Sequence, residues 1–377
     1  MGREQEQAAS PAAIIIGSSG VRLWGLTPQE RLRRALRLAG VTRIEESSEE
    51  APAGSYVLLR ADWVYDASLI AELVRRPGVV LTGGNGQPVA AHVPAAQVSA
   101  VRAVLETAPG ALLPEGLAML DAEGLAGNYN RSLRKRETPL LAPVTGQNAG
   151  ALEKRLFAGS YKGTTDVVTK YVWPLPARIV TKWCALAGIT PNQVTFTSLF
   201  LVILTFWAFW KGSFALGLAM AWVMTFLDTV DGKLARVTLT STKIGNVFDH
   251  GIDLIHPPFW WWAWIVGLGA SFGASGLVLA LVDGGYVLQR IEEGIFSRRH
   301  GFHIHVWHRF DSFFRLITAR RNPNLVILTI AVILGRPDVG MIVVAAWVVL
   351  CLIIHALRLW QAEMVVRSAP LTSWLDS

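Results

Sequence analysis

The 377-residue chain is 52% hydrophobic and 17% charged and contains 15 tryptophans, a composition too apolar for an ordinary soluble enzyme and typical of an integral membrane protein. The formal charge of +7 does not indicate nucleic acid, because many arginines cluster between apolar segments, where anionic lipid or a phosphorylated substrate is the better partner. Cys184 and Cys351 lie far apart in apolar surroundings, which excludes a disulfide framework and a metal-thiolate motif.

Residues 1–125 have the composition of a soluble α/β domain. The start of the chain, Met1 to Pro11, is polar and lacks an apolar core followed by a cleavage site, so we predict no secretory signal peptide and a cytoplasmic domain. Residues 12–25 predict a buried strand that runs into a Gly/Ser turn, and residues 28–40 have helical periodicity.

This strand, loop and helix resemble the nucleotide-binding start of sugar-nucleotide and cytidylyl transferases. The residues that match the family's glycine-rich loop and Arg-Leu pair are Gly17, Gly20, Arg22 and Leu23. A second strand, 56–66, resembles the family strand that ends in a metal-binding aspartate, here Asp62. The lysine expected after the loop is missing, so we interpret the domain as a degenerate nucleotidyltransferase-like domain with a structural or regulatory role. An active cytidylyltransferase is the alternative.

Residues 126–163 read as a linker whose basic run, 134–136, is expected to form a solvated face or to contact anionic headgroups. In the next segment, 164–187, apolar residues interleave with lysine and arginine. Because Pro174 and Pro176 interrupt this pattern, we predict two short amphipathic helices on the membrane surface rather than one.

From residue 188 to 362, hydropathy predicts six transmembrane helices, each near the ~20 residues that a bilayer core requires. Their expected bounds are 192–210, 213–234, 246–271, 274–296, 312–335 and 339–360. The segment from Arg290 to Arg321 holds seven arginines, so the positive-inside rule places it, both termini and the tail 363–377 in the cytoplasm. The predicted fold is a polytopic α-helical membrane protein of the inner (cytoplasmic) membrane with a small cytoplasmic α/β N-terminal domain.

Four aspartates stand at the ends of two apolar segments. On a helix, one face would carry Asp228, Asp231, Gly232, Ala235 and Arg236, and one face of the next would carry Gly245, Asp249 and Asp253. Placing carboxylates near hydrocarbon is costly, which argues against a packing role. Oxygen-only ligands favour a hard cation, Mg²⁺ or Mn²⁺, over zinc.

These residues fill all eight positions of the signature of the CDP-alcohol phosphotransferases, which residues 190–360 resemble strongly. The resemblance implies a six-helix membrane enzyme, commonly a homodimer. It moves a substituted phosphate group from a CDP-alcohol to an acceptor hydroxyl and releases CMP, making a phospholipid or a polyol phosphodiester. The alternative from a different class is a cation transporter, which would place its acidic residues near mid-membrane rather than at helix ends.

The resemblance also implies residue roles. Asp228, Asp231 and Asp249 would hold one or two Mg²⁺, and Asp253, counted with the metal-binding set, would be the general base. The residues assigned to CDP binding are Asn192, Thr195, Gly232, Arg236, Thr242 and Gly245. Helix capping is the alternative for the neighbouring Thr190 and Pro191, and an ordinary loop role is the alternative for Thr242.

Acceptor binding is assigned to five arginines on the cytoplasmic side: Arg298, Arg299, Arg315, Arg320 and Arg321. Contact with lipid headgroups is the alternative for each of them. The fused N-terminal domain resembles the arrangement of the bifunctional inositol-phosphate cytidylyltransferase and di-inositol phosphate synthase. We therefore expect an inositol-phosphate-like acceptor, with CDP-diacylglycerol or a CDP-polyol as donor.

Four histidines, His300, His303, His305 and His308, lie in a polar loop. They have no thiol partner and no recognisable ligand spacing, so the sequence does not predict a zinc site there.

Overall fold

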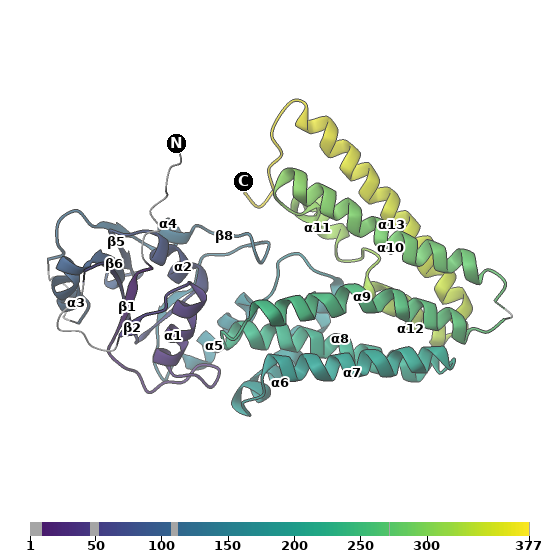
Figure 1. The fold of residues 1–377 in the computed structure, drawn as a ribbon, viewed down its shortest axis with the longest axis horizontal. Helices are drawn as coiled ribbons and strands as arrows, with labels where there is room; N and C mark the ends of the chain where they lie inside the picture. The colour runs from purple at the N-terminus through teal and green to yellow at the C-terminus, as the bar shows by residue number, and fades with distance from the viewer. Residues whose placement is uncertain (1–9, 46–52, 107–111, 271, 377) are drawn as a thin grey trace. The chain divides into compact units, whose positions relative to one another are not determined.

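The computed structural model describes residues 10–45, 53–106, 112–270 and 272–376 (Figure 1). The predicted absence of a signal peptide concerns a segment that lies almost wholly outside these residues. In the helix that begins at Lys243, the side chains at positions 243, 244, 246 and 249 are outside the description as well, so Asp249 is placed only by its backbone.

The chain forms two compact units. The first comprises Met1–Arg131, Arg136–Ser160 and Val237–Thr240. The second comprises Ser132–Lys135, Tyr161–Arg236 and Ser241–Ser377. The sequence-based domain boundaries at 125, 163, 187 and 362 remain predictions.

A mixed six-stranded sheet organises the first unit, with strand order β2-β1-β3-β6-β5-β7. Its strands are β1 (Ala12–Ile16), β2 (Ile44–Glu45), β3 (Ser55–Arg60), β5 (Val79–Thr82), β6 (Pro88–Pro94) and β7 (Ala118–Leu120). Strand β1 runs parallel to β2 and β3, β5 runs parallel to β7, and β6 is antiparallel to both of its neighbours.

Both faces of this sheet are covered, which explains why the predicted strand is a continuous apolar run. Ala13 and Ile15 of β1 belong to a core shared with helices α1 (Pro28–Leu38) and α2 (Ala67–Arg75). Ile14 and its even-numbered neighbours in β1 belong to the core under α3 (Val98–Glu106). The strand predicted at the start of 12–25 is therefore confirmed as β1, and the helix predicted within 28–40 is confirmed as α1.

The remaining elements of the first unit are short. They are β4 (Trp63–Tyr65), which pairs antiparallel with β10 (Leu141–Pro143), and the helices α4 (Ala122–Ala126) and α5 (Ala149–Gly159). The strand β8 (Tyr129–Asn130) also belongs to this unit, and β9 (Lys135–Arg136) spans a boundary between the two units.

Long helices make up the second unit. They are α6 (Pro174–Leu186), α7 (Pro191–Trp210), α8 (Phe214–Val237), α9 (Lys243–Gly267), α10 (Ser275–His300), α12 (Arg321–Ile333) and α13 (Pro337–Val366), joined by the short η2 (Val168–Val172), η3 (Ile304–Val306) and α11 (Arg309–Phe314). Helix α7 packs along α9, and α13 packs against both α10 and α12 (Figure 1).

Three of the described helices, α7, α8 and α13, are long and apolar enough to cross a membrane. Helices α9 and α10 have the length but carry acidic and basic side chains, so six spans remain a prediction. The expected fifth span, 312–335, is not one helix. It is divided between α11 and α12, because residues 315–320 form turns between them.

The tryptophans of α9 show how the helices of this unit are packed. Trp260 and Trp264 are fully buried, and both rings meet Phe209 of α7 edge to face. Near the ends of the same two helices, a Cβ on Gly267 would collide with the carbonyl oxygen of Phe209, so this close approach requires glycine.

Helix α6 has an exposed apolar stripe. Leu175, Ile179, Trp183 and Leu186 recur at helical spacing and are each more than 60% exposed. The two predicted helical segments are present as η2 and α6, and α6 begins at Pro174. Their location on the membrane surface remains a prediction.

Candidate active site

The first half of the site is built by α7 and α8. Asp228 and Asp231 stand one turn apart in α8, and the Asp231 side chain is buried. Its Oδ2 atom accepts a hydrogen bond from the hydroxyl of Thr195 in α7 at 2.6 Å. This bond orients the Asp231 carboxylate and joins the two helices at the motif.

Arg321, in the first turn of α12, bridges two of the motif aspartates. Its Nη2 atom donates to Asp228 Oδ2 at 2.7 Å, and its Nη1 atom donates to Asp253 Oδ1 at 2.5 Å. Asp253 belongs to α9, so carboxylates from two helices converge on one positive charge. The Asp253 side chain is 42% exposed, against 17% for Asp228, so it is the more accessible of the two.

This donor set fits a hard divalent cation, which binds carboxylate oxygens in preference to other ligands. Asp228 and Asp253 already reach a shared positive charge, and Asp231 lies on the same face of α8 as Asp228. The residues that could hold the cation are therefore Asp228, Asp231 and Asp253. The fourth predicted ligand, Asp249, has its side chain outside the described part of the chain.

Three of the predicted nucleotide-binding residues meet at the start of α9. The hydroxyl of Thr242 caps this helix by accepting a hydrogen bond from the Gly245 backbone N–H at 3.0 Å. A Cβ on Gly245 would lie 2.8 Å from that hydroxyl and 3.2 Å from Oδ1 of Asn192. The close approach of both polar side chains to the backbone explains the glycine.

Of the other three predicted nucleotide-binding residues, Thr195 lies on α7 and contacts Asp231, and Gly232 and Arg236 lie on α8. A Cβ on Gly232 would lie 3.7 Å from the guanidinium nitrogens of Arg236, so the Arg236 side chain extends over this glycine. At the start of α7, Thr190 forms a capping box with Gln193, which supports the capping alternative for Thr190.

The five predicted acceptor arginines fall into two groups. Arg298 and Arg299 are exposed near the C-terminal end of α10, where Arg299 pairs with Glu363 of α13 at 2.7 Å. Arg315, Arg320 and Arg321 lie in or beside the turns between α11 and α12, and of these Arg321 is the one bonded to the aspartate motif.

Asp166 anchors this second group and was not predicted. Its carboxylate accepts hydrogen bonds from the backbone N–H of Thr169 at 3.0 Å and from the Asn322 side chain at 3.0 Å. Burial raises the pKa of Asp166, but the positive charge of Arg315 and these hydrogen bonds outweigh it, so the pKa lies below its usual value. No pattern in the sequence links residues 156 positions apart in this way.

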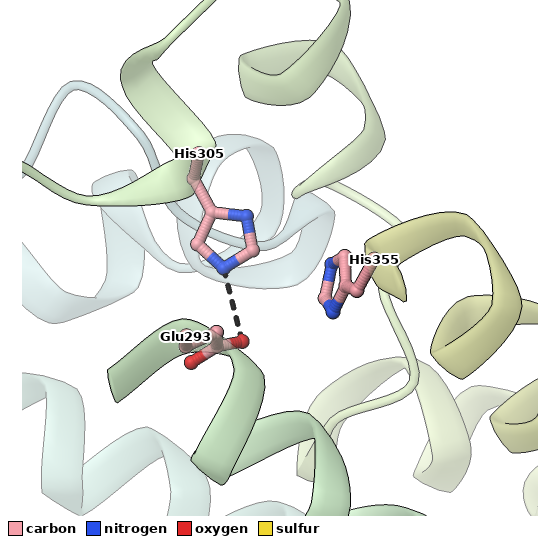
Figure 2. A group of neighbouring side chains, drawn as sticks. All are labelled: Glu293, His305 and His355. Atoms are coloured by element: carbon pink, nitrogen blue, oxygen red, sulfur yellow. Dashed lines mark hydrogen bonds and ion pairs between the residues drawn. The ribbon is translucent and has the colours of Figure 1, made fainter. Parts of the chain in front are cut away.

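A second group of metal-ligating side chains also escaped the sequence analysis. Glu293, His305 and His355 come from α10, η3 and α13, and their ligand atoms lie within 4.8 Å of one another (Figure 2). His305 belongs to the loop in which the sequence predicts no zinc site. Its two partners lie in helices far from it in the sequence.

The apolar helices indicate a helical membrane protein, and the converging carboxylates form a site suited to a hard cation. Residues 188–290 match the family model of CDP-alcohol phosphatidyltransferase, and this stretch contains the whole aspartate motif. This part of the chain is therefore similar to the family that the motif predicts.

Curated relatives are similar to parts of the chain as well. The chain is 29% identical to Cholinephosphotransferase 1 of Xenopus laevis over 150 residues, which are 36% of this chain and 34% of the relative. It is 29% identical to Cholinephosphotransferase 1 of Gallus gallus over 136 residues, or 32% and 38% of the two chains. It is 37% identical to Archaetidylinositol phosphate synthase of Pyrococcus horikoshii over 79 residues, or 21% and 42%. The chain thus spans about a third to two fifths of the length of these relatives.

Proposed function

We propose that this protein transfers a substituted phosphate group from a CDP-alcohol to an acceptor hydroxyl and releases CMP, in phospholipid or polyol-phosphodiester biosynthesis. The observation that carries the proposal is the convergence of Asp228 and Asp253, which both lie in the segment that matches the family, on the positive charge of Arg321. A CDP-alcohol presents a pyrophosphate, whose negative charge needs the same kind of neutralisation when its anhydride bond breaks.

Asp228, Asp231, Asp249 and Asp253 form the proposed site for Mg²⁺ or Mn²⁺. When bound, such a cation supplies charge neutralisation at the pyrophosphate. The hydrogen bond from the Thr195 hydroxyl holds the Asp231 carboxylate in an orientation for binding the cation. The remaining proposed nucleotide contacts lie at the N-terminal ends of α7 and α9 and at the C-terminal end of α8. They are Asn192, Gly232, Arg236, Thr242 and Gly245.

Asp253 is the proposed general base that accepts the proton of the acceptor hydroxyl. Its greater exposure makes it accessible to a substrate, and its contact with the guanidinium of Arg321 fixes the position of the carboxylate. Arg321 also belongs to the proposed acceptor-binding set, so an acceptor phosphate bound there would hold its hydroxyl group close to the base.

The acceptor is proposed to be an inositol-phosphate-like polyol, bound by arginines of the second group. The archaeal relative is named as an archaetidylinositol phosphate synthase, which supports this acceptor. The other two relatives are named as cholinephosphotransferases, which supports a donor of the CDP-choline type in place of CDP-diacylglycerol. Donor and acceptor must therefore be tested as a matrix.

The membrane context completes the proposal. We propose, together with the activity, that the protein has six transmembrane helices and lies in the inner membrane. Both termini and the active site would face the cytoplasm, and the protein would form a homodimer. The exposed apolar stripe of α6, flanked by Arg178 and Lys182, supports contact with the membrane surface.

The N-terminal domain is proposed to be a degenerate nucleotidyltransferase-like domain. Asp62 follows β3 as predicted for a metal-binding aspartate, but Arg60 donates to both of its oxygens, at 3.0 and 2.6 Å. A carboxylate that is already neutralised in this way is a poorer metal ligand, which supports the degenerate interpretation. Release of pyrophosphate from CTP and a polyol phosphate by the full-length protein would establish the active alternative.

The decisive experiment uses purified full-length protein with Mg²⁺ and a matrix of CDP-alcohols and acceptors. We expect CMP release that depends on one donor and one acceptor, with a product whose mass equals the donor plus the acceptor minus CMP. The matched controls are the Asp228→Asn and Asp253→Asn variants. If no pair gives CMP and the protein reconstituted in vesicles conducts divalent cations, the transporter alternative replaces the enzyme.

A further inference from the structure

We propose a second metal site, formed by Glu293, His305 and His355, that binds Zn²⁺ or a similar borderline transition metal and is distinct from the aspartate motif. The proposal goes beyond the transferase activity and does not depend on it, because metal binding is measured directly.

Three elements bring the ligands together (Figure 2). The Nε2 atom of His305 lies 3.1 Å from Oε1 of Glu293, and the ring of His355 lies beside the His305 ring at a centroid distance of 5.4 Å. Both histidines are buried, at 3% and 2% exposed, and the Glu293 side chain is 14% exposed. The cluster is therefore a buried group of ligand atoms that face one another, not a surface patch.

His355 provides the second observation. Within the described residues neither of its ring nitrogens has a hydrogen-bond partner, although the residue is only 2% exposed. A buried polar group without a partner destabilises the fold, so an imidazole here needs a reason. A metal ion bound by one ring nitrogen would supply that partner, whereas a leucine would pack in the same place without the cost.

The donor set selects the metal. Two imidazole nitrogens and one carboxylate oxygen suit zinc and neighbouring transition metals, whereas Mg²⁺ prefers oxygen ligands. Ligand atoms bound tetrahedrally at about 2.1 Å lie about 3.4 Å apart. Because the present separations extend up to 4.8 Å, binding would draw the three side chains closer together.

Arg320 is the competitor for this site. Its Nη2 atom donates to the same Glu293 oxygen that His305 contacts and lies 3.3 Å from the His305 ring nitrogen. A guanidinium and a metal ion cannot both neutralise that oxygen at close range. Removing the arginine charge is therefore expected to strengthen metal binding, while removing a ligand is expected to weaken it. If the cluster is only an ion-pair network that binds no metal, these two kinds of substitution should not have opposite effects on metal binding.

The neighbouring residue links this cluster to the aspartate motif. Arg320 and Arg321 are adjacent at the start of α12, and Arg321 holds Asp228 and Asp253. A metal ion that displaces Arg320 from Glu293 would change the anchoring of this turn. The site is therefore placed to influence the position of the arginine that contacts the proposed active site.

The test uses full-length protein in detergent, stripped of metal with a chelator and dialysed against Zn²⁺ in the presence of excess Mg²⁺ to saturate the aspartate motif. We expect one tightly bound zinc per chain. X-ray absorption of the wild-type zinc protein should report imidazole nitrogens in the first coordination sphere, and this readout requires no variant. Absence of bound zinc, or coordination by oxygen alone, would overturn the proposal.

Matched variants locate the ion. His305→Gln, His355→Gln and Glu293→Gln should each weaken zinc binding more than tenfold, whereas Arg320→Gln should tighten it. The controls His303→Gln, two positions from His305 and exposed, and Glu292→Gln, next to Glu293, should bind as the wild type does. Undiminished zinc binding in the His305/His355 double variant would disprove the assignment, and circular dichroism of each metal-free variant separates loss of ligand from loss of fold.

Discussion

The guanidinium of Arg321 lies 2.5 Å from the carboxylate of Asp253 and holds it beside Asp228. The two aspartates lie 25 positions apart in the sequence and in different helices, and the arginine comes from a third. A residue assigned to the acceptor thus lies in direct contact with the proposed base. Under the proposed function, this arrangement would bring the donor chemistry and the bound acceptor to the same place.

The first prediction concerns the base. Asp253→Asn should lower CMP release by about 10²-fold or more, because an amide cannot take the acceptor's proton. The fold should persist, since Arg321 keeps its bond to Asp228. The control is Asp338→Asn, which removes a carboxylate that also pairs with an arginine, Arg336, but lies outside the motif. Full activity of Asp253→Asn would show that another group is the base.

A second prediction concerns Arg321 as a counter-ion. Arg321→Gln leaves Asp228 and Asp253 close together without their shared positive charge, so the Mg²⁺-free protein should lose about 1–3 kcal/mol of unfolding free energy. Mg²⁺ should stabilise this variant more than it stabilises the wild type, as measured by thermal unfolding in detergent.

The matched control for that measurement is Arg336→Gln, which breaks an exposed ion pair with Asp338 and should change stability by less than ~1 kcal/mol. An equal Mg²⁺ response in wild type and Arg321→Gln would argue against a cation site between the two aspartates.

Thr195 supports a third prediction. Thr195→Val removes the 2.6 Å hydrogen bond to Asp231, so the Mg²⁺ concentration for half-maximal activity should rise about tenfold. Thr195→Ser keeps the donor and should behave as the wild type does. Thr197→Val, which removes an exposed hydroxyl bonded to its own helix at Gln193, should have no effect. A Mg²⁺ requirement unchanged in Thr195→Val would mean that Asp231 needs no such support.

Crowding at the start of α9 gives a fourth prediction. In Gly245→Ala the new Cβ would lie 2.8 Å from the Thr242 hydroxyl, so that hydroxyl and its cap must shift. The KM for the CDP-alcohol should rise about tenfold, or about 1.4 kcal/mol, with a smaller change in kcat. Gly251→Ala in the same helix meets no atom of the described residues within 4 Å and serves as the control. A KM unchanged in Gly245→Ala would remove this region from the nucleotide site.

The fifth prediction follows from the pKa of Asp166, which is lowered in the folded protein by Arg315 and by hydrogen bonds that together outweigh burial. A lowered folded-state pKa stabilises the protein above the unfolded value of about 4, and this contribution is lost as the pH falls through the folded-state pKa. Asp166→Asn should therefore cost about 1–2 kcal/mol at neutral pH, and its difference from the wild type should shrink in acid.

Thermal unfolding followed from about pH 7 to about pH 3 tests this. The control is Asp121→Asn, which alters an exposed helix cap, at the start of α4. A difference between Asp166→Asn and wild type that does not depend on pH would show that the charge of Asp166 does not stabilise the fold.

The local chemistry of the sequence determined the elements of this protein. Apolar runs predict the helices, the alternation of Ala13 and Ile14 between two cores accounts for the buried strand, and the spacing of Asp228 and Asp231 places them on one helical face. These properties depend on residues a few positions apart, so a single sequence contains them. The family match at 188–290 rests on the same local spacing.

Only the tertiary structure decided which distant side chains meet. Arg321 joins Asp228 and Asp253, Asn322 joins Asp166, and the loop residue His305 joins Glu293 and His355. It also divided the expected fifth span at residues 315–320, where the chain turns to bring Arg320 and Arg321 to the two carboxylate sites. Such pairings depend on helix packing, which follows from side-chain shape over the whole unit rather than from any local pattern.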